Sequence, residues 1–204
     1  MSLVTDHDST ASGYEAVPLP LAPGGEAGAD SANASVLRRR SARPTRRAVV
    51  YVHCTGDSFV SADLAAWYVD RGFHFYVADL STVGEGGEPG ARGDQNVAGE
   101  LSECFACLDA AVTHLRDTEA IDTVVVGAHG AGAVIAALWS HARRGSQPLD
   151  ALVLASPEFT SPSRRAAGGQ SQRRPWPLLA GAQRRLRRGL DIACPVLVMC
   201  PEAG

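Results

Sequence analysis

The strongest constraint on the fold is one continuous segment in the second half of the chain. Residues 122–135 read Asp-Thr-Val-Val-Val-Gly-Ala-His-Gly-Ala-Gly-Ala-Val-Ile. An unbroken apolar run is typical of a strand that is covered on both faces of a parallel sheet, and three glycines permit a sharp turn after it. Small and apolar residues then continue at helical spacing. The segment predicts a strand, a tight turn with His129 at its apex, and a helix.

Strand-like and helix-like patterns alternate along the rest of the chain. Apolar strands are expected at 48–52, 73–78, 123–126, 152–155 and 196–199, and helices at 62–71, 98–116 and from the turn to Arg143. The first helix is expected to place Trp67 on its apolar side and to stop at Gly72. This alternation specifies a doubly wound, mostly parallel α/β sheet with flanking helices. Ligands of such a sheet bind outside the carboxyl ends of its strands. Upstream, 14–21 and 35–38 are expected to form an edge hairpin, because prolines in the first stretch cannot serve a central ladder.

The chain of 204 residues is long enough for one domain with a sizeable core. We expect residues 1–12 to be a flexible leader and residues 13–204 to form the α/β domain. Within that domain, residues 162–175 are rich in Ser, Gly, Gln and Arg, a composition that favours flexibility.

Composition excludes several classes of function. The net charge of −3 gives no reason to expect nucleic acid as a partner, and all 19 basic residues are arginine. Without lysine, the chain cannot carry a Walker A phosphate loop or form a lysine Schiff base. No apolar run approaches the roughly 18 residues of a membrane-spanning helix, and no signal peptide is visible. We therefore expect a cytoplasmic protein that does not span a membrane.

Two arginine clusters and five cysteines have plain structural interpretations. The arginines between Arg38 and Arg47 are expected on a solvated edge, and those of 164–188 on a solvated face that pairs with acidic segments. An anionic partner for the second cluster, such as phosphates or lipid headgroups, remains an alternative. The cysteines are interpreted as reduced thiols. Cys104 and Cys107 fall on one apolar helical stripe, which favours a core position over a redox or metal site.

Several segments carry a resemblance to a known family. They resemble α/β-hydrolases, in particular actinobacterial lysophospholipase-like and serine-aminopeptidase-like enzymes, and they lie in the expected order at 51–57, 71–80, 127–132, 136–139, 154–157 and 189–199. The resemblance covers roughly residues 12–204. It implies the α/β-hydrolase fold with its cap nearly absent and its last strand and helix missing. It also implies an ancestral reaction of acyl transfer from a carboxylic ester to water.

The resemblance assigns site residues by position. The nucleophile of the G-x-S-x-G elbow falls on His129 instead of serine. The oxyanion hole would use the backbone N–H groups of Gly130 and Thr55. The acid falls loosely on Glu202, and the family's histidine has no counterpart. We expected the apex residue to carry a strained backbone.

Several interpretations of His129 are open. The serine mechanism can be lost, because the apex has no hydroxyl to activate, or the imidazole itself can act as the nucleophile. His53 and Asp79 lie in loops expected at the same edge of the sheet and are candidate binding residues. With Glu202 they show no metal-ligand spacing, so no metal is expected. His53 alone is most simply a packing residue. A dinucleotide loop is disfavoured, because the glycine spacing is not G-x-G-x-x-G.

These observations lead to one functional expectation and one alternative. The chain is expected to be a relative of esterases and lysophospholipases that is weakly active or inactive, with an acyl ester or lipid-like small molecule as its substrate if it is active. No cofactor is expected. The alternative is a non-catalytic binding or interaction module. An exposed strand at 196–199 would also permit self-association.

Overall fold

The structure is a computed structural model, and it describes residues 13–19, 35–53, 62–80, 94–146, 149–157, 186 and 188–200, with side chains described from residue 101 onward in the long helix. The predicted leader at 1–12 and the predicted flexible segment at 162–175 lie outside the described residues. The same is true of Thr55, Glu202 and nearly all of the arginine cluster at 164–188.

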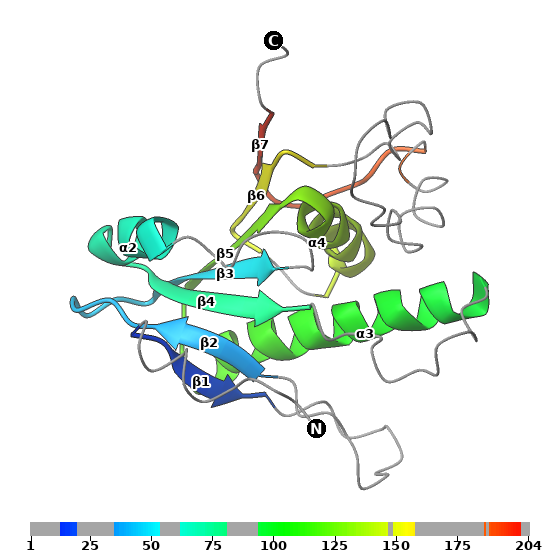
Figure 1. Cartoon of the computed structure of the whole chain (residues 1–204). Coiled ribbons are helices and arrows are strands. Elements are labelled where there is room, and N and C mark those ends of the chain that lie inside the picture. The colour runs from blue at the N-terminus through cyan, green and yellow to red at the C-terminus, as the bar shows by residue number, and fades with distance from the viewer. Residues whose placement is uncertain are drawn as a thin grey trace, which may run out of the picture.

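The described residues form a seven-stranded sheet, which confirms the predicted fold class (Figure 1). Its order is β1-β2-β4-β3-β5-β6-β7. The first two strands are antiparallel to each other, and β2 is antiparallel to β4, whereas β4, β3, β5, β6 and β7 run parallel. The strands span Glu15–Pro18 (β1), Ser35–Arg39 (β2), Arg47–His53 (β3), His74–Asp79 (β4), Thr123–His129 (β5), Ala151–Ala155 (β6) and Val196–Met199 (β7).

Helices cover both faces of this sheet. They span Ala62–Asp70 (α2), Asp94–Thr113 (α3) and Gly130–Arg143 (α4), and a π-helical turn at His114–Thr118 (η1) follows α3. Figure 1 shows α2 on one side of β3 and β4 and α3 on the other. Gly72 lies just beyond α2 with a φ of +76°, which confirms the predicted glycine stop, since glycine adopts this conformation at no steric cost. None of the helices in the described ranges is long and apolar enough to cross a membrane.

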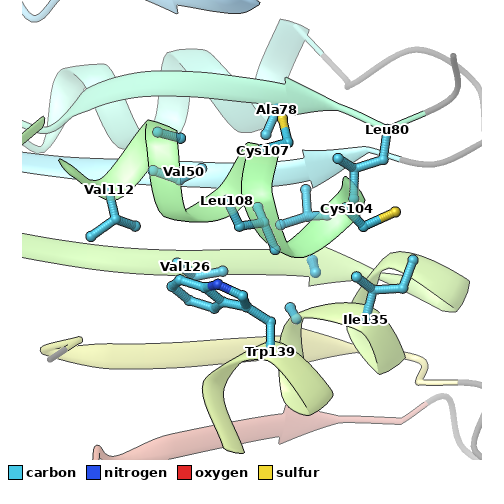
Figure 2. Close-up of a cluster of buried hydrophobic side chains, with 14 of the residues drawn as sticks. Val50, Ala78, Leu80, Cys104, Cys107, Leu108, Val112, Val126, Ile135 and Trp139 are labelled. Atoms are coloured by element: carbon cyan, nitrogen blue, oxygen red, sulfur yellow. The ribbon is translucent and has the colours of Figure 1, made fainter. Parts of the chain in front are cut away.

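The larger core lies between the sheet and the helices α3 and α4. Figure 2 shows side chains of both helices meeting those of the central strands, among them Val50, Val126, Leu108 and Trp139. Cys104 and Cys107 are buried in this core, which confirms the interpretation of the Cys-x-x-Cys spacing as part of a helix face. Burial, together with the negative charge of Asp79, raises the pKa of the Cys107 thiol to about 11.

A smaller core lies between the sheet and α2. It is formed by Tyr14, Val49, Ala65, Phe75 and Val77, with partly buried side chains around it. Trp67 was expected on the apolar side of this helix, but it is 48% exposed. The guanidinium of Arg71 lies over its ring, 3.9 Å from the centroid. A cation–π contact of this kind is compatible with exposure, so the outward position of the indole has a physical explanation.

The prediction that the first arginine cluster is solvated is wrong for Arg38. Its side chain is only 8% exposed and is paired with Glu119, which follows η1 and is 13% exposed. A second pair joins Arg38 to the exposed Glu15 at 2.7 Å. Arg38 and Glu119 are separated by 81 positions, so no local pattern in the sequence indicates this pairing. Arg46 follows the prediction, since its pair with Asp122 is exposed on both sides.

Candidate functional site at the carboxyl edge of the sheet

The site is built around the junction between β5 and α4. Strand β5 continues to His129, three residues further than predicted, and α4 begins at Gly130. His129 has φ −126° and ψ 152°, an ordinary extended conformation, and the left-handed φ of +55° falls on Gly130. The expected strain at the apex residue is therefore absent. Glycine absorbs the turn without a Cβ clash, so the histidine before it can keep strand geometry.

Three of the predicted site residues end neighbouring parallel strands. Asp79 is the last residue of β4 and is the register partner of His53, the last residue of β3. On the other side of β3, Val52 is the register partner of Ala128. His129 therefore lies one position beyond the partner of Val52, next to His53. The strand order thus places Asp79, His53 and His129 in a row across three strands, which are spaced about 4.8 Å apart.

The three residues also belong to the same face of the sheet. Val52, Ala78 and Ala128 lie in the core under α3 and α4. Side chains alternate between faces along a strand, so the residues that follow them belong to the α2 side. All three are half-buried. Asp79, His53 and His129 therefore form a carboxylate–imidazole–imidazole row, which we call the edge row.

The edge row lies where the topology opens a crevice. Strand β3 is flanked by β4 and β5, and the chain leaves β3 through α2 on one face but leaves β4 and β5 through α3 and α4 on the other. Because the crossovers after β3 and β5 pass over opposite faces of the sheet, they diverge between these two strands. This place is the topological switch point, where ligands of open α/β sheets bind. His53 and His129 end the two strands on either side of this point.

The chemistry available in the edge row is that of proton transfer and nucleophilic attack by imidazole. Among the residues that the structure describes, no group of three His, Cys, Asp or Glu side chains could hold a metal ion. Cys107 is a poor nucleophile because its raised pKa keeps the thiol protonated near neutral pH. The roles of Thr55 and Glu202 stay predictions.

The sequence predicted that these three residues lie at one edge of the sheet, but not that His53 lies between Asp79 and His129. His53 was interpreted as a packing histidine, because nothing in its local sequence links it to His129. The strand order supplies that link. The available signal was the position of each residue directly after an apolar strand, which already predicted that the three loops meet at one edge.

Several solved structures are similar to this fold. A candidate esterase from Staphylococcus aureus is 15% identical, with a TM-score of 0.54, and the match covers 92% of this chain and 64% of that one. Est1E from Butyrivibrio proteoclasticus is 12% identical with a TM-score of 0.49, covering 70% and 51%. TT1662 from Thermus thermophilus is 15% identical with a TM-score of 0.48, covering 94% and 90%. The chain thus spans about half the length of Est1E.

The sheet order, the flanking helices and the strand–turn–helix at His129 define an α/β-hydrolase. The family model described as "Serine aminopeptidase, S33" matches residues 43–194, and because this is most of the chain, the protein belongs to that hydrolase family. The resemblance inferred from the sequence is confirmed. A search of curated protein sequences returned no match.

Proposed function

We propose that the protein is a relative of carboxylic-ester hydrolases and lysophospholipases whose edge row turns over esters weakly or not at all. The observation that carries this proposal is His129 at the junction of β5 and α4. At this position the serine mechanism needs a hydroxyl whose proton a neighbouring base can take. An imidazole can form acyl adducts, but it cannot repeat the serine cycle with the same groups.

The proposed substrate class is a small acyl ester, including lipid-like esters, and the proposed location is the cytoplasm. The family and the esterase-like structures support the substrate class. A panel of p-nitrophenyl esters of increasing acyl length, followed by a lysophospholipid, tests the proposed weak or absent turnover of this class. Hydrolysis by the wild type that stays near that of the heat-denatured protein is expected, and rapid saturable turnover of any ester would contradict the proposal.

The second candidate is a binding module that keeps the crevice above the sheet but performs no chemistry. The same residue favours it, because replacing serine by histidine removes the hydroxyl while His129 retains ordinary strand geometry. A non-cleavable alkyl ether analogue of a lysophospholipid separates the two candidates. Saturable binding without turnover of the ester supports the module, and turnover without measurable affinity for the ether excludes it.

We also propose that the protein can self-associate through β7. The side chains of this strand are between 41% and 55% exposed although all four are apolar. Within the described sheet, β7 pairs only with β6, and such an edge can pair with another strand. Sedimentation of the wild type and of Leu197→Lys tests this. A concentration-dependent dimer that the charge abolishes is expected, and a monomer at all concentrations would rule it out.

A further inference from the structure

The edge row contains more than a histidine at the apex. His53 ends the strand next to that of His129, and Asp79 is the register partner of His53 on its other side. In this arrangement an imidazole stands between a carboxylate and a second imidazole. We propose that His129 is an acyl acceptor, that His53 takes its proton, and that Asp79 is the positioning residue that orients His53. This inference rests on the proposal that the edge row is the reactive site.

The strand order accounts for the division of roles. The end residue of the middle strand can reach both neighbours across one strand spacing of about 4.8 Å, whereas Asp79 and His129 are two spacings apart. A carboxylate beside an imidazole fixes its tautomer and orientation and stabilises its protonated form. His53 is therefore suited to accept a proton, and His129, which directly precedes the helix α4, is suited to attack an acyl group.

The proposed step balances without a further reactant. A ring nitrogen of neutral His129 attacks the carbonyl carbon of an activated acyl compound, and the bond from that carbon to the leaving oxygen breaks with its electron pair. The N–H proton that His129 loses passes to His53 and then to the leaving oxygen. The products are an N-acyl imidazole at His129 and the released alcohol or acid.

Acylation of His129 can occur once without rapid turnover of the substrate. An N-acyl imidazole must be hydrolysed by water before a second cycle begins. Single acylation and steady-state hydrolysis are therefore separate observables, and the proposed roles of His129 and His53 require only the first.

Diethyl pyrocarbonate is a suitable probe, because it transfers an ethoxycarbonyl group to neutral imidazole and releases ethyl hydrogen carbonate, which decomposes to carbon dioxide and ethanol. The full chain is treated at low reagent concentration, and the rate at each histidine is followed by peptide mass spectrometry. His141 is the internal control. It lies on α4, and its Nδ1 is 2.9 Å from the backbone nitrogen of Asp191, outside the edge row.

In the wild type, His129 is expected to react at least about tenfold faster than His141. His53→Gln should lower the rate at His129 by at least about tenfold, because general-base assistance is typically worth 10²–10⁴-fold. Asp79→Asn, which keeps the shape of the side chain, should give an intermediate loss. The rate at His141 should not change in either variant, and this reports that the fold is intact.

Two results would overturn the inference: equal rates at His129 and His141 in the wild type, or a rate at His129 that neither variant lowers. If His53→Gln also changes the rate at His141, Asp79→Asn alone decides. Failure here is distinguishable from failure of the proposed function, because ester turnover is measured separately. Rapid turnover with a rate at His129 that is independent of His53 would contradict both proposals.

Discussion

Removing the charge of Arg38 should destabilise the protein more than removing any exposed arginine of its cluster. The Arg38 and Glu119 side chains are 8% and 13% exposed. Loss of one partner from a buried ion pair typically costs about 3–5 kcal/mol when the remaining charge stays buried without compensation. Glu119 keeps two weaker partners, Arg40 at 3.8 Å and His114 at 3.3 Å. Because Arg38→Met also keeps much of the aliphatic volume, the loss should fall near the lower end of that range.

The pH dependence of folding stability gives a second test of the Arg38–Glu119 pair. Burial by itself would raise the pKa of Glu119, but the charge of Arg38 and a hydrogen bond with His114 hold that pKa below its ordinary value. A carboxylate with a lowered folded-state pKa adds stability above its unfolded pKa and loses it as the pH falls through the folded value. The wild type should therefore lose this contribution only below about pH 4.5. In Arg38→Met the largest influence that lowers this pKa is removed while those of His114 and Arg40 remain, so the loss of stability on acidification should become smaller.

Urea denaturation followed by circular dichroism measures both effects. The matched control is Arg46→Met, which removes a pair whose partners are 64% and 63% exposed and should cost no more than about 1 kcal/mol. In a double-mutant cycle, Arg38→Met combined with Glu119→Gln should be less destabilised than the two single losses added together. A cost for Arg38→Met that equals that of Arg46→Met would refute the argument.

Two further predictions concern local chemistry and backbone. Iodoacetamide at pH 8 should modify the exposed Cys200 at least about 100-fold faster than Cys107, whose buried thiol has its pKa raised to about 11, and similar rates in alkylation mass spectrometry would contradict this. Gly72→Ala should cost about 1–2 kcal/mol in thermal or urea unfolding, because its φ is +76°. Gly145→Ala meets nothing within 4 Å and should change stability by less than about 0.5 kcal/mol; equal costs at the two glycines would show that the conformation at Gly72 is not the cause.

Most of the fold could be predicted from local patterns. The apolar strands, the stripe that buries Cys104 and Cys107, and the glycine after α2 follow from the periodicities of strands and helices. The edge hairpin followed from the prolines of its first strand. These features depend on residues close together in the sequence, so the sequence alone carries enough information.

What could not be predicted depends on contacts between distant residues or on backbone details. Arg38 is buried because its partner lies 81 positions away. The edge row requires the strand order β4-β3-β5, which no single motif specifies. His129 has an unstrained conformation because the next residue, Gly130, takes the positive φ. A glycine also follows the apex residue in an elbow whose apex is strained, so its presence in the sequence does not predict which conformation occurs.

We propose that the protein retains the fold of a hydrolase and that His129, in the position of the serine, removes the serine chemistry. The most direct measurement is the rate of p-nitrophenyl ester hydrolysis by the wild type, His129→Ala and His129→Ser, at equal concentrations and with a heat-denatured control. Hydrolysis by the wild type and by His129→Ala is expected to remain near the control. Hydrolysis by the wild type well above the control, and lost in His129→Ala, would contradict it.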